Sequence, residues 1–315
     1  MGRYRPTSPE ELPKFAGVRT FMRMPHVRTL EDVNFVVVGI PFDDATTFRS
    51  GARFGPEGIR SISAMIRPWH PVHDIDVFEH LSGVDYGDVA VVPGDVEATC
   101  EKTARDFQAI AAAGVTSFAM GGDHSVTLGE LRGLCAVHGP LALVHFDAHV
   151  DTSEGNYGRK YDHGTPFRRA AEEKLVETSR SIQIGIRGGR AGPEYYQQSR
   201  DMGYEVIAMH EFEQLGVAAV LERIHKRVGD MQCFITIDID AVDPAYAPGT
   251  GTPEVGGFTS REILNLVRGL KGLNIKGGDV LEVIPAIDTG EITAYLAANL
   301  LYEMICLQAL AHRGG

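Results

Sequence analysis

The sequence, 315 residues long, lacks the features that mark several large classes of protein. It has no run of about 18 apolar residues, so we expect no transmembrane helix and no membrane partner. Residues 1–15 contain no apolar stretch of the kind found in a secretory signal, which predicts a cytoplasmic location. No segment rich in proline, serine or charge divides the chain. We therefore expect one domain over residues 1–315, with residues 1–33 as an extension that packs on it or lies at a subunit interface.

Cysteine and basic residues are both scarce. The four cysteines are far apart and show no CxxC spacing, which excludes a disulfide framework and a thiolate metal site. Lys and Arg number 30 against 42 Asp and Glu, so the formal net charge is −12. Because contacts to phosphate groups need a basic face, we expect no nucleic-acid partner. A negative protein instead attracts cationic substrates.

Glycine, in contrast, is abundant at 36 residues, and many glycines follow short runs of β-branched and other apolar residues. These runs are apolar throughout rather than alternating with polar residues. That pattern is typical of strands buried on both faces of a parallel sheet. The predicted strands are 35–38, 116–120, 141–146, 181–184, 204–207, 233–237 and 279–283.

Helical patterns fill the intervals between these strands. The predicted helices are 97–113, 125–137, 166–175, 217–228, 260–270 and 292–310. Strand and helix alternate over the whole length, which predicts an α/β fold with a mostly parallel sheet and right-handed crossovers. Ligands bind beyond the carboxyl ends of the strands in such sheets, so polar residues after each apolar run are the candidates for chemistry.

Three of the predicted strands end in aspartate and histidine. The candidate side chains are His124, Asp147, His149, Asp151, Asp238 and Asp240. If the chain stays extended, residues spaced two apart point to the same side, which would bring Asp147, His149 and Asp151 together. A single aspartate at a strand end more commonly forms a turn, and Asp243 before Pro244 is interpreted in that way. His145 is left out of the candidate set because it lies within an apolar run.

A divalent cation would stabilise these six aspartate and histidine side chains. Several carboxylates at one sheet edge repel one another, and a bound cation removes that cost. Six protein ligands exceed the three that a catalytic zinc ion takes, whereas two metal ions sharing bridging carboxylates fit. The oxygen-rich, sulfur-free donor set favours Mn²⁺, with Ni²⁺, Co²⁺ and zinc as alternatives.

The three motifs resemble those of the ureohydrolase family, which includes arginase, agmatinase and guanidinobutyrase. The motifs are Gly-Gly-Asp-His at 121–124, Asp-Ala-His-x-Asp at 147–151 and Asp-Ile-Asp-x-x-Asp-Pro at 238–244. The resemblance, closest to the agmatinase and guanidinobutyrase branch, implies a three-layer α/β/α sandwich whose mostly parallel central sheet has roughly eight strands. It also implies two Mn²⁺ ions per chain on the six candidate residues, and a homotrimer or homohexamer.

The activity implied by the resemblance is hydrolysis of a guanidino group to urea and an amine, by attack of a metal-bridging hydroxide. In that pattern Glu282 matches the acid that holds the substrate guanidinium. His163 matches the histidine that gives a proton to the departing amine, and Asp151 is placed to receive the proton of the hydroxide. Each also has a plainer interpretation, since His163 precedes a predicted helix and Glu282 ends a predicted strand.

The substrate is less well specified by the sequence. The loop at 152–162 should border the substrate tail, with Asn156 and Arg159 as candidate contacts. It departs from the arginase pattern for an amino-acid head group, so arginine is disfavoured. The expected substrate is a small linear guanidine of the agmatine or 4-guanidinobutyrate type. The alternatives are 3-guanidinopropionate, free or substituted guanidine, and a metal-binding partner subunit without activity of its own.

Overall fold

The computed structural model describes residues 3–189, 192 and 194–314. Its centre is an eight-stranded sheet in the order β4-β1-β5-β10-β9-β6-β7-β8, with every neighbouring pair parallel. The strands are β1 (Phe35–Ile40), β4 (Gly83–Asp88), β5 (Thr116–Gly121), β6 (Ala142–Phe146), β7 (Ile182–Ile186), β8 (Glu205–Ala208), β9 (Gln232–Asp238) and β10 (Asn274–Leu281). A short antiparallel pair, β2 (Trp69–His70) and β3 (Ile75–Asp76), stands apart from the sheet.

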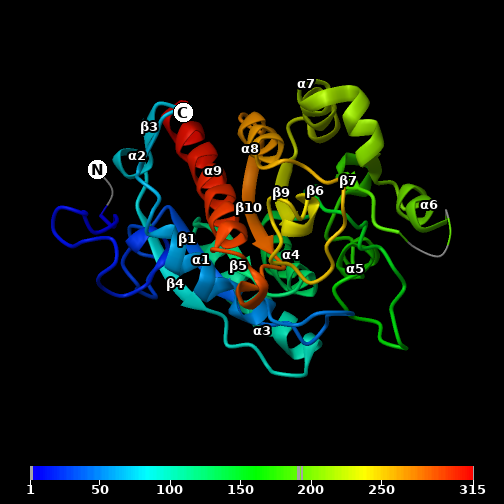
Figure 1. Cartoon of the computed structure of the whole chain (residues 1–315), viewed down its shortest axis with the longest axis horizontal. Helices are drawn as coiled ribbons and strands as arrows, with labels where there is room; N and C mark the ends of the chain where they lie inside the picture. Colours follow the sequence, from blue (N-terminus) through cyan, green and yellow to red (C-terminus); the bar gives the residue numbers. More distant parts are fainter. Residues whose placement is uncertain (1–2, 190–191, 193, 315) are drawn as a thin grey trace.

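Helices cover both faces of the sheet, as Figure 1 shows. They are α1 (Gly55–Ser63), α2 (Val77–His80), α3 (Val96–Ala112), α4 (Thr127–His138), α5 (Pro166–Glu172), α6 (Glu194–Asp201), α7 (Met209–Val228), α8 (Ser260–Gly269) and α9 (Ile292–Gly314). On one face α1, α9, α8 and α7 pack in succession, and on the other α3, α4 and α5 do so. The predicted three-layer α/β/α sandwich is confirmed.

The apolar runs of the sequence fill both layers of the core. Along β1, Phe35 and Val37 join the core on the α9 side, whereas Val36 and Val38 join the core on the α3 and α4 side. All residues of β1 are buried. A strand covered on both faces has no solvent side, which explains why its sequence does not alternate between apolar and polar residues.

The structure differs from the sequence expectation in several elements. β4 was not expected, because its sequence Gly-Val-Asp-Tyr-Gly-Asp lacks an apolar run and lies at the sheet edge. α1 and α6 were also not expected. β10 begins at Asn274 and ends at Leu281, so Glu282 lies just beyond the strand rather than within it. α7 begins eight residues earlier than the predicted 217, across Gly216, whose φ of 75° marks a kink in the helix.

Residues 3–33 lie against the β1–β4 end of the sheet. Tyr4 N donates to Ser82 Oγ, and Phe21 N donates to the side chain of Asp85, at 2.9 and 2.8 Å. Met22 N donates to Ser63 Oγ at the end of α1. The segment is therefore tied to the sheet and to α1 by backbone donors.

Helix α9 is long and apolar enough, by length and composition alone, to cross a membrane. Of its most apolar window, 72% is buried inside the protein. It packs against α1, α8 and β10, and Figure 1 shows it in red across one face of the sheet. Its apolar side chains therefore form part of the hydrophobic core, as expected for a helix that is hydrophobic on all sides.

A buried ionic cluster ties α9 to the β2–β3 pair. The carboxylate of Glu303 on α9 lies 3.0 Å from His70 Nε2 and 3.2 Å from His73 Nε2, and it accepts from Arg268 Nε at 2.7 Å. Burial by itself would raise the pKa of Glu303, but the bonds from His70, His73 and Arg268 outweigh it and lower that pKa to about 2.

We expect Glu303→Gln to lower the free energy of unfolding by about 2–3 kcal/mol at pH 7. Because the pKa of Glu303 is depressed in the folded state, its contribution is complete above about pH 5 and is lost as the pH falls toward 2. Urea denaturation of both proteins from pH 7 to pH 3 measures this. The difference should shrink with falling pH, whereas the exposed Glu213→Gln should differ little from the parent throughout. A difference that stays constant with pH would contradict the assignment.

Candidate metal centre

Four neighbouring strands in the middle of the sheet, β5, β10, β9 and β6, end at the same edge. His124 follows β5, Glu282 follows β10, Asp238 ends β9, and Asp147 follows β6. Parallel strands present their carboxyl ends side by side, so residues far apart in the sequence meet at this edge. Gly122 allows the close approach that this needs, because a Cβ there would lie 1.8 Å from the carbonyl oxygen of Phe42.

The chain after these strands turns rather than staying extended, which corrects the expected geometry. Asp147 accepts a hydrogen bond from His149 N at 2.6 Å, and Asp238 accepts one from Asp240 N at 2.9 Å. Asp151 has a φ of 48°, in the left-handed region. The side chains nevertheless converge, because Asp147 and Asp238 each fix a tight turn by accepting a hydrogen bond from the backbone N–H two residues on.

One part of the cluster surrounds Nδ1 of His124. Oδ2 atoms of Asp147 and Asp151 lie 3.1 Å from it, and Oδ2 of Asp238 lies 3.4 Å from it. All four side chains are almost completely buried. Separations of about 3 Å are those of neighbouring ligands held at about 2.1 Å from one ion.

The other part surrounds Nδ1 of His149. Oδ1 of Asp147 lies 3.4 Å from this nitrogen and Oδ2 of Asp240 lies 3.1 Å from it. Glu254 Oε1 lies 3.7 Å from the other ring nitrogen. Asp147 therefore offers one oxygen to each part, as a carboxylate shared between two ions does.

The ring nitrogens of His124 indicate whether a cation fits between this histidine and the three carboxylates. Its Nε2 lies 2.8 Å from Thr236 Oγ1. With Nε2–H directed at that hydroxyl oxygen, His124 keeps a lone pair on Nδ1. His124 Nδ1 is buried and has no hydrogen-bond partner. A lone pair that faces three carboxylates is the arrangement that a metal ion stabilises.

The carboxylates themselves indicate a surplus of buried negative charge. Burial, reinforced by Asp240 and Asp147, raises the pKa of Asp238 well above its usual range. Burial also raises the pKa of Asp240 to about 6, with His149 opposing the rise and Asp147 adding to it. A divalent cation would restore the charged form of both groups, so the donor set fits the group that the motifs imply.

His145, which the sequence interpretation left out, also belongs to this site. Its Nε2 lies 2.7 Å from Asp147 Oδ2, and its Nδ1 accepts from the side-chain amide of Gln183 at 3.0 Å. Nε2 therefore carries the proton and donates it to Asp147. His145 orients a candidate ligand and is not a ligand itself. Its spacing of two residues from Asp147 was the available signal.

His163 and Glu282 lie together beside the cluster. His163 Nδ1 is 3.0 Å from Glu282 Oε1, and Thr47 N donates to His163 Nε2 at 3.2 Å. Burial lowers the pKa of His163, but the bond to Glu282 and its charge outweigh this and raise the pKa to about 9. The Thr47 N–H acts in the opposite sense, since it needs an unprotonated Nε2. Thr47 is a site residue that no motif indicated.

A cavity of about 330 Å³ opens onto the cluster. Its lining includes Thr47, Phe48, Gly189 and Glu254, together with candidate residues of the cluster, His149, Asp151, His163 and Asp238. Asn156 and Arg159 are not among the lining residues. Asn156 donates twice to Asp162, through N and Nδ2, both at 2.9 Å. Arg159 lines a neighbouring cavity with Asp44, so the structure does not bring these two residues to the cluster.

Comparisons with known proteins find a matching family, similar sequences and a similar solved structure. A model described as the Arginase family matches residues 33–306. Guanidinopropionase of Pseudomonas aeruginosa is 42% identical over 306 residues, which cover 97% of this chain and 96% of that protein. The mitochondrial agmatinase of Gallus gallus is 41% identical over 302 residues, covering 96% and 89%. The solved structure of proclavaminate amidinohydrolase from Streptomyces clavuligerus superposes with a TM-score of 0.92 at 41% identity, covering 95% of this chain and 99% of that one.

The sandwich fold, the paired clusters and these likenesses define the class of protein, a metal-dependent amidinohydrolase. The chain belongs to the arginase family, which confirms the resemblance seen in its three motifs. Members of this family use a binuclear metal centre.

We expect His145→Asn to weaken Mn²⁺ binding by about 10- to 100-fold, because Asp147 loses the donor that orients it. Metal content after dialysis against buffers of fixed free Mn²⁺ measures this. His138→Asn, a partly buried histidine at the end of α4, is the control and should bind as the parent does. Unchanged affinity in His145→Asn would show that Asp147 needs no such donor.

Proposed function

We propose that this chain is a single ureohydrolase domain that hydrolyses the guanidino group of a small linear guanidine to urea and an amine. Its two metal ions would be held by His124, Asp147, His149, Asp151, Asp238 and Asp240. We further propose Mn²⁺ as the native metal, a cytoplasmic location and a homotrimeric or homohexameric assembly. Residues 1–33 form an extension on the domain or at a subunit interface in this proposal.

The main support for this proposal is the hydrogen bonding of the two carboxylate oxygens of Glu282. Oε1 already accepts from His124 N at 3.0 Å and faces His163. Oε2 is buried and has no hydrogen-bond partner. A buried carboxylate oxygen without a donor is costly, and a planar guanidinium offers the charged N–H groups that it lacks. Glu282 is thus placed to bind the guanidinium and to hold its central carbon toward the metal cluster.

The remaining chemistry divides among the neighbouring residues. When bound, the two metal ions would supply an activated water as nucleophile at neutral pH. Asp151, whose Oδ2 faces the cluster, takes up the proton released as the carbon–oxygen bond forms. His163 gives a proton to the amine nitrogen as the carbon–nitrogen bond breaks, and the carboxylate of Glu282 keeps the His163 ring oriented for this.

The charges that line the cavity also favour one kind of substrate tail. Among its described residues there is no lysine or arginine, whereas Glu254 is partly exposed there. A carboxylate near the cavity mouth attracts an ammonium group. We therefore place agmatine, with its cationic tail, first among the candidate substrates and 4-guanidinobutyrate second. Asn156 is assigned an indirect role, since it fixes Asp162 next to His163, and Arg159 is assigned no substrate contact.

Urea release by the Mn²⁺-loaded protein tests the proposal across agmatine, 4-guanidinobutyrate, 3-guanidinopropionate, arginine and guanidine. We expect a clear preference for agmatine. Glu254→Gln should raise KM for agmatine about tenfold and leave KM for 4-guanidinobutyrate unchanged or lower, because the cationic tail loses its counter-charge whereas the anionic tail loses only a repulsion.

A preference for 4-guanidinobutyrate would overturn the assignment of Glu254 but keep the reaction. No urea from any of the five compounds, repeated with Ni²⁺ and Co²⁺, would contradict the reaction itself. In that case the metal-binding partner subunit without activity would be the better interpretation.

Two variants separate the roles of Glu282 and His163. Glu282→Gln should lower kcat/KM by about 100-fold or more, because it removes the charge that holds the guanidinium. His163→Asn should lower kcat by about 100- to 10,000-fold with little effect on KM or on Mn²⁺ content. Steady-state kinetics together with metal analysis measures both. Loss of metal from His163→Asn would show that its role is structural.

A further inference from the structure

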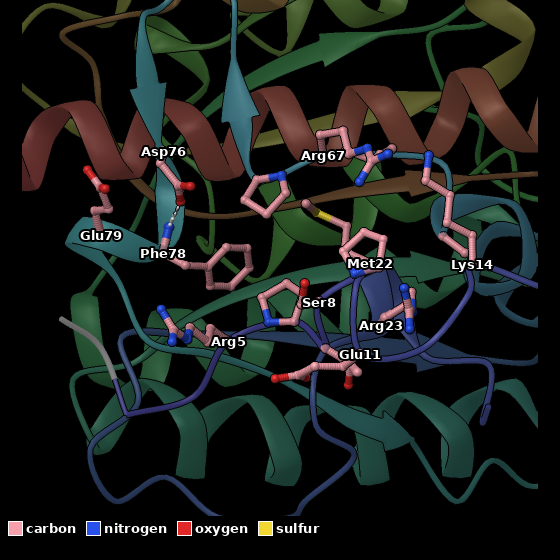
Figure 2. A pocket seen from close by; sticks show the side chains of 16 residues that line it. Arg5, Ser8, Glu11, Lys14, Met22, Arg23, Arg67, Asp76, Phe78 and Glu79 are labelled. Carbon is pink, nitrogen blue, oxygen red and sulfur yellow. Dashed lines mark hydrogen bonds between the residues drawn. The ribbon is translucent and has the colours of Figure 1, made fainter. Parts of the chain in front are cut away.

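A cavity of about 380 Å³ lies between the N-terminal segment and the α1, β3 and α2 region, and none of its lining residues belongs to the metal centre. Its walls come from residues 5–14, 22–23, 64–68 and 76–79. Figure 2 shows the side chains that surround it. A volume in this range is that of a site for a small molecule.

One end of this cavity is cationic. Figure 2 shows Lys14, Arg23 and Arg67 grouped on the same side. Burial lowers the pKa of Lys14, and the nearby charges of Arg67 and Arg23 lower it further, so the three cations lie within electrostatic reach of one another. Lys14 Nζ donates to the carbonyl oxygen of Met65, and Arg23 Nη2 donates to that of Leu12. Within the described part of the chain, none of the three forms an ion pair with a carboxylate.

Arg23 is the unusual member of this group. Its side chain is about nine-tenths buried, and its Nη1 is buried without a hydrogen-bond partner. Its backbone has a φ of 63°, next to Met22 with a φ of 51°. Burying an unpaired guanidinium is unfavourable unless negative charge comes close to it. This residue therefore indicates that a counter-charge belongs in the cavity.

Apart from these three cations, the lining contains apolar side chains, three carboxylates and Arg5. Met22, Ile66 and Phe78 are buried and form the apolar part of the wall. Carboxylates also line the cavity, at Glu11, Asp76 and Glu79, but Asp76 is used by Phe78 N at 2.9 Å. Figure 2 shows Asp76 and Glu79 at the end away from Lys14 and Arg67.

We propose that this cavity is a binding site for a small organic anion, whose carboxylate or phosphate group is held by Lys14 and Arg67 and whose apolar body packs on Met22, Ile66 and Phe78. The anion supplies the negative charge that Arg23 lacks. The distribution of charge along the chain agrees with this, because residues 1–33 carry six Lys or Arg against four Asp or Glu, whereas the whole chain is at −12. This inference is independent of the proposed reaction.

Isothermal titration of the Mn²⁺-loaded full chain at low ionic strength, with benzoate and separately with phenyl phosphate, tests the proposal. The first probe carries a carboxylate and the second a phosphate, so the two arms show which group the cations prefer. We expect one site per chain for at least one probe. Arg67→Gln should weaken that binding about tenfold, and the Lys14→Gln, Arg67→Gln double variant should weaken it further.

Two controls keep the test specific. Arg105→Gln removes an exposed arginine of α3 that pairs with Glu101, and it should bind the probe as the parent does. Urea release by the Lys14 and Arg67 variants should also be unchanged, since neither residue lines the metal cavity. A probe that binds at the metal centre instead would inhibit urea release and keep its affinity in these variants, which would overturn the proposal. No binding of either probe by the parent below about 10 mM would overturn it as well.

Discussion

The concentration of buried carboxylates around Nδ1 of His124 is the constraint on which the rest of the site depends. Three carboxylate oxygens lie within 3.4 Å of a buried nitrogen whose lone pair faces them. Such an arrangement is unstable by itself in a medium of low dielectric constant. It becomes favourable when a divalent cation occupies the space between the oxygens. Metal binding and the integrity of this sheet edge are therefore coupled.

The supporting structure keeps these groups in place against their mutual repulsion. Asp147, Asp238 and Asp240 also accept backbone or side-chain hydrogen bonds, as Asp147 does from His149 N and His145. His124 is held from the other side by Thr236. These contacts come from the ends of strands in the centre of an eight-stranded sheet, where each strand is held by a neighbour on both sides. Rigid support of this kind fixes ligand geometry before the metal arrives.

Buried charge recurs at three other places, and it is balanced to a different degree at each. At Glu303 the carboxylate is fully matched by two histidines and Arg268, and the result is a tie between α9 and the β2–β3 pair. At Arg23 the charge is left without a partner inside a cavity. At Glu282 one oxygen is matched and the other is not. Matched charges stabilise the fold, whereas unmatched ones point to ligands.

The sequence by itself determined the class of fold and the candidate ligands, because apolar runs report burial on both faces and the polar residues that end them report the functional edge of a parallel sheet. It could not give β4, whose residues carry little periodic signal and which lies at the sheet edge, or α1, whose nine residues include two glycines and a proline. Nor could it give the turns that direct Asp147 and Asp151, the contribution of Thr47, or the role of His145.

The sequence pointed to Asn156 and Arg159 because of loop position, but the folded loop turns Asn156 toward Asp162 and Arg159 toward Asp44. Those outcomes depend on contacts between residues far apart in the chain, and only the tertiary structure decides which of them form.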